Sequence, residues 1–282
     1  MTNHPQPEVI TIGPGDPVAA VVGGVHGDEP SGVSGIRRMV ELIEEGAVEL
    51  EHAVRFIVAN PPALEIGKRF VTADLNRSFP GDPEGIGEAW LASVICELIE
   101  DIPTLTLHAT RSRPTPFGFA DHDDERGIDL ACRLSLPHVI LGDADEIGSL
   151  GACGSVITVE AGPQGSDEAC EAAFEFIREF LLATGAIAGG APLKDPIIYE
   201  GEAEVPKPPG DTYEVLAENF VKVSPGEVYA RVDGEPLIAD EEFYPILMSA
   251  DGYDDILGFR ARKVAESLSE LRARQAGSSS GG

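Results

Sequence analysis

A nearly continuous apolar run at residues 18–25 constrains the fold of this chain more than any other feature. Such a run, closed by glycines, is typical of a strand that is buried on both faces of a sheet. Apolar residues at helical spacing follow it, and Gly46 ends that segment. Further strands are expected at 54–59, 104–107, 138–141 and 155–159, and further helices at 88–100 and 167–182. This alternation predicts an α/β fold in which helices flank the sheet.

The pattern changes near residue 190. The segment 184–196 is rich in Gly and Ala and indicates a domain junction, and short strands split by Pro and Gly follow it. We therefore expect a larger domain over 1–190, a small β-rich domain over 196–274 and a disordered tail over 275–282.

The charge of the chain limits its partners. Its 282 residues include 49 acidic and 20 basic side chains, for a formal net charge of −29. Phosphate binding requires basic patches, so nucleic acid is not expected as a partner. A charge this far from zero keeps a protein soluble when salt screens it, which indicates the salt-rich cytosol of a halophile. A protein that is merely acidic is the alternative.

We expect neither a membrane span nor an export signal from the sequence pattern. No apolar run reaches the roughly 18 residues that a membrane span needs. The first residues, MTNHP, contain neither a basic start nor an apolar stretch. We therefore expect a soluble, cytoplasmic protein.

The cysteines do not form a motif. They stand at positions 96, 132, 153 and 170 without any CxxC pair, so reduced structural thiols are expected. Cys153 lies in a segment of small residues, 151–154, and is a candidate to approach the site.

Donors suited to a metal ion follow two of the predicted strands. His26 and Glu29 come directly after the first strand, at the carboxyl edge of the sheet where ligands of α/β proteins collect. This spacing alone is common in surface turns. His108 follows the strand 104–107 and should reach the same edge, although a lone histidine at a strand end is usually structural. Two nitrogens and one carboxylate form a known catalytic zinc set, so the three donors predict a metal site.

Two further segments carry candidate catalytic groups. Glu160 ends a predicted strand and could act as general base for a water beside the metal, with capping of the following loop as the alternative. Arg69, Asn76 and Arg77 share one loop in a chain that is poor in basic residues. An arginine offers a planar fork that matches a carboxylate or an oxyanion. Surface salt bridges to nearby acids are the alternative for these arginines.

Four segments share their order and spacing with a known family. They read GGVHGDEPSGV, NPPALEIGKRFVTADLNRSFPG, LHATRSRPTPFG and VEAGPQGS across residues 20–165. Together they resemble the succinylglutamate desuccinylase and aspartoacylase family, a branch of the zinc carboxypeptidase-like hydrolases. The resemblance implies a mixed sheet of the zinc carboxypeptidase kind, with 1–190 as the catalytic domain. It implies hydrolysis of the amide bond of a small N-acyl amino acid.

The resemblance also implies a role for each catalytic candidate. It places one zinc ion on His26, Glu29 and His108. It implies that Glu160 is the general acid/base and that Arg69 polarises the carbonyl of the scissile amide.

Substrate-binding roles follow from the same resemblance. It implies that Asn76 and Arg77 hold a carboxylate of the substrate. Tyr253 looks like the tyrosine that faces the substrate in aspartoacylases. The arginine that follows the third ligand in desuccinylases has two possible equivalents here, Arg111 and Arg113.

One departure from the family keeps other functions open. Members usually have Asp-Leu-His before the third ligand, whereas this chain has Thr106-Leu107-His108. Loss of an acidic group behind a metal ligand can weaken metal affinity or activity by roughly 10–100-fold. The alternatives are a zinc carboxypeptidase that acts on short peptides and a metal-binding protein that has lost catalysis. The acyl group, the amino acid, the identity of the divalent metal and the oligomeric state stay open.

The acidic composition predicts a salt requirement. The purified protein should unfold at a higher temperature in molar KCl than in low-salt buffer, because salt screens repulsion among its 49 acidic side chains. Thermal unfolding followed by circular dichroism in both buffers measures this difference. Equal stability in the two buffers would contradict the halophile hypothesis and favour a merely acidic protein.

Overall fold

The computed structural model describes residues 4–111, 115–143 and 149–278. Up to the expected junction the elements are β1 (Glu8–Ile12), β2 (Pro17–Gly23), α1 (Ser31–Glu44), β3 (Ala53–Val58), α2 (Pro61–Ile66), η1 (Leu75–Arg77), α3 (Glu88–Ile99), β4 (Thr104–Thr110), β5 (Phe117–Asp121), α4 (Glu125–Ala131), β6 (His138–Gly142), η2 (Leu150–Cys153), β7 (Val156–Pro163) and α5 (Asp167–Thr184). Beyond it they are β8 (Ile197–Pro206), β9 (Tyr213–Val215), β10 (Val228–Val232), β11 (Glu235–Ile238), β12 (Tyr244–Ile246), β13 (Ile256–Ala265) and α6 (Leu268–Ser278). No helix in the described ranges is long and apolar enough to cross a membrane.

Ten strands form one mixed sheet in the order β1-β3-β2-β4-β7-β5-β6-β8-β13-β12. Strands β3, β2, β4 and β7 run parallel to one another, and so do β5, β6 and β8. Antiparallel pairing joins β5 to β7 and occurs at both ends of the sheet. The expected α/β class with a mixed sheet is therefore confirmed.

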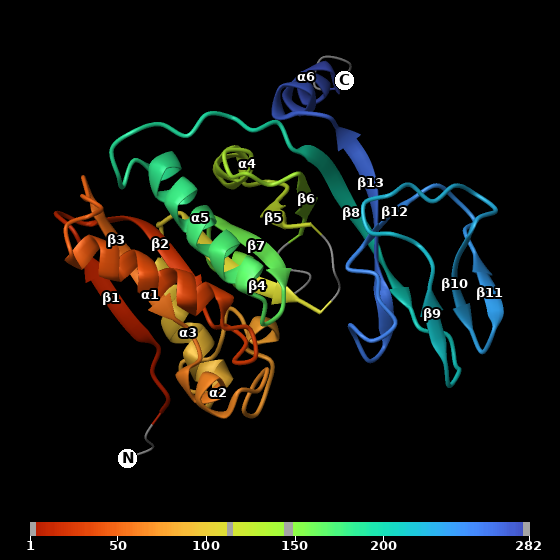
Figure 1. The fold of residues 1–282 in the computed structure, drawn as a ribbon, viewed down its shortest axis with the longest axis horizontal. Helices are drawn as coiled ribbons and strands as arrows, with labels where there is room; N and C mark the ends of the chain where they lie inside the picture. The colour runs from red at the N-terminus through yellow and green to blue at the C-terminus, as the bar shows by residue number, and fades with distance from the viewer. Residues whose placement is uncertain (1–3, 112–114, 144–148, 279–282) are drawn as a thin grey trace.

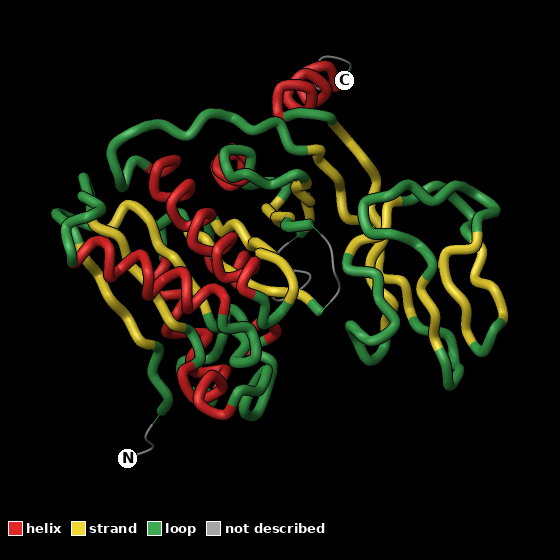
Figure 2. The backbone as a smooth tube through the Cα atoms, viewed as in Figure 1, coloured by secondary structure: helices red, strands yellow, loops and turns green. Residues whose placement is uncertain are grey.

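Helices cover both faces of the central strands (Figure 2). On one face, Val21 of β2 packs in a buried cluster with Met39 of α1 and Ile177 of α5. On the other face, its neighbour Val22 packs in a second cluster with Ile95 of α3. Successive side chains of a strand point to opposite faces, so a strand buried on both faces needs an apolar residue at every position. This requirement explains the continuous apolar run in the sequence.

The large sheet continues into the C-terminal part of the chain. Strand β8 pairs in parallel with β6, and β13 and β12 follow it at the sheet edge. Strands β9, β10 and β11 form a separate small sheet, at the right of Figure 1. The division into domains over 1–190 and 196–274 stays a prediction. Helix α6 extends to Ser278, and the last part of the predicted tail, 279–282, lies outside the described residues.

A disulfide joins Cys96 of α3 to Cys153 of η2, with their Cα atoms 5.1 Å apart. The expectation of reduced thiols is therefore wrong for this pair. The two cysteines are 57 residues apart in the sequence, and only the packing of η2 against α3 brings them together. Cys132 and Cys170 are free. Cys153 was a candidate to approach the site. It does not line the cavity described below, although Gly151 of the same segment does.

Candidate active site

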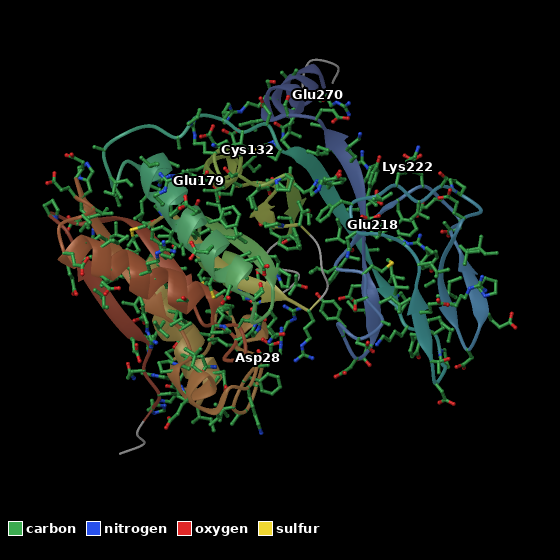
Figure 3. The ribbon with its side chains drawn as sticks, in the orientation of Figure 1. Asp28, Cys132, Glu179, Glu218, Lys222 and Glu270 are labelled. Atoms are coloured by element: carbon green, nitrogen blue, oxygen red, sulfur yellow. A yellow bond between two sulfur atoms is a disulfide. The ribbon has the colours of Figure 1, made fainter. Side chains whose placement is uncertain are left out.

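A tight turn after β2 carries the first two predicted ligands. His26 and Glu29 are buried, with 3% and 6% of their surfaces exposed. Gly24 turns the chain out of the strand with a φ of +70°, a conformation that glycine adopts readily. Gly27 packs directly on the backbone of α2, where a side chain would overlap it. Asp28, between Gly27 and Glu29, marks this turn in Figure 3.

Three donor groups converge inside the protein. Nδ1 of His26 lies 2.8 Å from Oε1 of Glu29, and Nδ1 of His108 lies 3.1 Å from Oε2. One donor atom from each residue lies within 4.8 Å of the others. His108 stands within β4 rather than after it, because the strand continues its pairing with β7 as far as Thr110. Two buried imidazole nitrogens and one carboxylate oxygen at this spacing suit a zinc ion.

Asp74 joins this centre to the arginine-bearing loop. Its Oδ1 accepts a hydrogen bond from Nε2 of His26 at 3.1 Å, and its Oδ2 accepts one from Nε of Arg69 at 2.9 Å. A carboxylate behind a histidine ligand fixes the tautomer and the orientation of the ring. The sequence analysis missed this residue. Its position two residues before Asn76, in the segment DLNR, was the available signal.

The unusual Thr106 leaves the other histidine without such support. The hydroxyl of Thr106 and Nε2 of His108 are both buried without a hydrogen-bond partner in the described part of the chain. They lie two residues apart on one strand, and therefore on the same face of the sheet. Among the described residues, a carboxylate thus lies behind Nε2 of His26 but not behind Nε2 of His108.

Burial and neighbouring carboxylates set the charges at this centre. Burial would lower the pKa of His26, but hydrogen bonds with Asp74 and Glu29 outweigh it and raise the pKa to about 9. Burial would raise the pKa of Glu29, but the bonds from His108 and His26 hold it far below its usual range. For His108 burial dominates, lowers the pKa and favours the neutral ring. Without a metal, these shifts favour a protonated His26 over a protonated His108.

Glu160 lies directly beside His108, the third predicted ligand. It is the register partner of His108 across β4 and β7. Its Oε2 atom is buried and has no hydrogen-bond partner in the described ranges, so this oxygen caps no loop. Burial, together with the negative charge of Glu29, raises the pKa of Glu160 to about 8. A carboxyl group that titrates near neutral pH can both accept and return a proton.

A cavity of about 780 Å³ brings the predicted residues together. It is lined by every residue that the sequence proposed for metal binding, catalysis or substrate binding and that the structure describes: His26, Glu29, Arg69, Asn76, Arg77, His108, Arg111, Glu160 and Tyr253. Strands β12 and β13 and the loop between them contribute Ile246, Leu247, Tyr253 and Phe259 to its wall. The cavity therefore lies between the parallel strands and the C-terminal part of the chain.

The arginines of the cavity differ in their partners. Arg111 donates to Oδ2 of Asp28 and to Oε1 of Gln164, at 3.2 Å in both cases. Gln164, which the sequence analysis did not propose, also donates to the backbone of Asp28. Arg77 makes no side-chain hydrogen bond or ion pair within the described residues. The other candidate, Arg113, lies outside the described residues.

The fold and the site together define a mixed α/β protein with a candidate metal centre at the carboxyl edge of its parallel strands. The family profile described as the succinylglutamate desuccinylase/aspartoacylase catalytic domain matches residues 16–184. The chain therefore belongs to the succinylglutamate desuccinylase/aspartoacylase family.

Curated relatives match over shorter segments. The succinylglutamate desuccinylase of Pseudomonas paraeruginosa is 35% identical over 79 residues, which cover 27% of this chain and 24% of that protein. The N-alpha-acetyl-L-2,4-diaminobutyric acid deacetylase of Halomonas elongata is 37% identical over 73 residues, which cover 24% of this chain and 21% of that protein. The chain thus matches about a quarter of the length of these relatives.

Solved structures match over nearly the whole chain. The succinylglutamate desuccinylase/aspartoacylase from Rhodobacter sphaeroides superposes with a TM-score of 0.72 at 20% sequence identity. The match covers 91% of this chain and 89% of that one. It extends the shared fold beyond the profile to the C-terminal strands.

The packing of Gly27 predicts a sensitive position. Gly27→Ala should lower the melting temperature and abolish stoichiometric zinc binding, because the new methyl group would overlap the backbone of α2 and displace the turn. Overpacking of this kind costs about 1–3 kcal/mol or more. Thermal unfolding and metal analysis after dialysis test this. Gly190→Ala is the control, since that glycine faces open space. A Gly27→Ala protein with unchanged stability and zinc content would contradict the prediction.

Proposed function

We propose that this chain is a zinc-dependent amidohydrolase that cleaves the amide bond of a small N-acyl amino acid. One observation carries the proposal: the buried His26, Glu29 and His108 donors lie beside Glu160, whose Oε2 atom is buried and has no hydrogen-bond partner among the described residues. Membership of the family supports it. A cytoplasmic location, and adaptation to salt as in a halophile, belong to the same proposal.

In this proposal His26, Glu29 and His108 hold one zinc ion. Zinc at such a site lowers the pKa of a water molecule to about 7 and polarises the substrate carbonyl. Asp74 keeps the Nε2 proton of His26 in a hydrogen bond, which leaves Nδ1 of the same ring available as the metal ligand.

The protein's own side chains move the proton and stabilise charge. Glu160 accepts a proton from the attacking water and returns it to the nitrogen of the scissile amide, so that the amine leaves neutral. A guanidinium has five N–H donors; Nε of Arg69 donates to Asp74, and its Nη1 lies 3.5 Å from Oε1 of Glu29 in an ion pair. The others can donate to the carbonyl oxygen as it becomes negative. Loss of one such donor typically costs about 10²–10³-fold in rate.

The arginines of the cavity favour a substrate with a single carboxylate. Three of the four that line it in the described ranges are held in ion pairs, namely Arg69, Arg111 and Arg260. Arg77 has no such partner, so its guanidinium is available for bidentate binding of a carboxylate. Asn76 lines the cavity next to it and would support the same group.

Acidic side chains on the C-terminal side favour the same class of substrate. Glu204, Asp251 and Asp254 line the cavity without an ion-pair partner in the described ranges. A second carboxylate on the substrate would meet like charge there, whereas a neutral or cationic side chain would not. The name of the Halomonas elongata relative denotes an amino acid with an additional amino group. We therefore propose N-acyl amino acids with neutral or cationic side chains as the preferred substrates.

A zinc carboxypeptidase acting on short peptides is the alternative enzyme. Ile246, Leu247 and Tyr253 line the cavity from its C-terminal side, which favours small substrates over peptides. A metal-binding protein that has lost catalysis is disfavoured by the presence of Glu160 and Arg69 beside the candidate ligands.

The role of Glu160 predicts a loss of turnover without a loss of metal. Glu160→Gln should reduce kcat by about 10²–10⁴-fold, the usual contribution of a positioned general base, and should still bind one zinc ion per chain. Hydrolysis assays and metal analysis measure the two quantities. Glu168→Gln, an exposed acid on α5, is the control. Undiminished turnover in Glu160→Gln, or purified wild-type protein that contains no zinc, would contradict the mechanism.

The charges of the cavity predict a substrate order. In low salt, kcat/KM should be about tenfold higher for N-acetyl-asparagine and Nα-acetyl-diaminobutyrate than for N-acetyl-aspartate, which corresponds to about 1.4 kcal/mol. Glu204→Gln should reduce this preference, whereas Glu200→Gln should preserve it, because Glu200 shares strand β8 but does not line the cavity. Faster hydrolysis of the aspartate compound would refute the charge argument. Dipeptides as the best substrates would favour the carboxypeptidase.

A further inference from the structure

No side chain of the segment 70–73, between Arg69 and Asp74, belongs to a hydrophobic core cluster of the described residues. Residues 70–73 are all exposed, although Phe70 and Val71 are apolar. On the C-terminal side of the loop, the buried side chain of Leu75 fixes the chain in the core. The segment 70–73 therefore needs another restraint to keep its two neighbours at the site.

Glu88 supplies this restraint from the first turn of α3. Only 2% of the surface of Glu88 is exposed to solvent. Its carboxylate accepts hydrogen bonds from the backbone N–H groups of Val71 at 2.7 Å, Thr72 at 3.3 Å and Ala73 at 3.3 Å, and also from the hydroxyl of Thr72. Gly87 allows this approach, because a Cβ atom there would lie 2.8 Å from the Thr72 hydroxyl oxygen.

The electrostatics of this contact agree with its geometry. Burial would raise the pKa of Glu88, but the hydrogen bonds from Thr72 and Val71 outweigh it and lower the pKa. The carboxylate also stands at the N-terminus of a twelve-residue helix, where the helix dipole favours negative charge. Removal of one partner of a buried charged hydrogen bond leaves the other unsatisfied, which is the costly case.

The restrained segment connects directly to the candidate centre. Arg69 precedes it and Asp74 follows it, and these two side chains are hydrogen bonded to each other. Asp74 in turn accepts the bond from His26. A displacement of the backbone at 71–73 would therefore move two groups. One is Arg69, which is proposed to bind the substrate carbonyl, and the other is Asp74, which accepts the hydrogen bond from the proposed ligand His26.

We propose that Glu88 is a positioning residue, which clamps the backbone of 71–73 and thereby holds Arg69 and Asp74 in place for catalysis. The part that concerns catalysis rests on the proposed function. Glu88 does not line the cavity and touches no substrate in this proposal.

The clamp itself is tested by amide hydrogen exchange on metal-free protein, independently of turnover. In Glu88→Gln, the amides of 71–73 should exchange about tenfold faster. The substitution replaces one acceptor oxygen by an NH2 group, which cannot accept the backbone N–H bonds. Thr72→Val removes only the hydroxyl bond and should give a smaller effect, which Thr72→Ser should rescue. Glu97→Gln, an exposed glutamate on the same helix, is the matched control. Wild-type exchange at 71–73 in Glu88→Gln would overturn the clamp.

The positioning role is tested by two further measurements on the same variants. Zinc affinity, measured by competition with a chelator, should fall severalfold in Glu88→Gln and stay unchanged in Glu97→Gln. With the best N-acyl amino acid, kcat should fall by about tenfold with a smaller change in KM, because Arg69 is proposed to act on the developing oxyanion. Faster exchange with unchanged zinc affinity and kcat would reduce Glu88 to a structural residue. Wild-type protein that hydrolyses no substrate would instead refute the proposed function, and exchange and zinc affinity would still decide the role of Glu88.

Discussion

The candidate centre depends on the pairing of the Glu29 carboxylate with two histidines. Its two oxygens contact the Nδ1 atoms of His26 and His108, which come from separate parts of the chain. A buried carboxylate is costly unless it is paired. His26 supplies one partner from the same turn, and His108 supplies the other from β4. The backbone N–H of Ala109 donates to the same carboxylate at 3.1 Å. The donors are thus assembled by the protein itself, and a metal ion would replace protons rather than organise the site.

The arginine-bearing loop depends on this centre from the other side. Asp74 is hydrogen bonded to both His26 and Arg69, so a proposed metal ligand and a cationic group of the loop share one carboxylate. Glu88 holds the preceding backbone from α3, and α3 lies on the sheet face opposite α1 and α5. The position of Arg69 is therefore linked to the core through hydrogen bonds rather than through apolar packing. This explains how an exposed loop can carry groups that must be placed precisely.

Much of the fold and part of the site follow from local sequence. The alternation of apolar runs and helical periods predicts the α/β class, because burial on both faces requires apolar residues throughout a strand. Parallel strands bring their carboxyl ends to one edge, so His26 and His108 are predicted to meet from strand positions alone. For Arg69 and Arg77, residue type indicates the chemistry, but only the family resemblance assigns the individual roles.

Contacts between distant segments were decided by the tertiary structure alone. The pairing of Cys96 with Cys153 depends on the packing of η2 against α3, which no local pattern reports. The clamp by Glu88 requires a helix start to meet a loop, and the sequence shows only an ordinary acidic residue at the start of a helix. The sequence alone determined which donor types lie at the sheet edge, because strand periodicity sets side-chain direction. Only the folded chain decided which carboxylates support them, because hydrogen-bond partners are chosen by proximity in space.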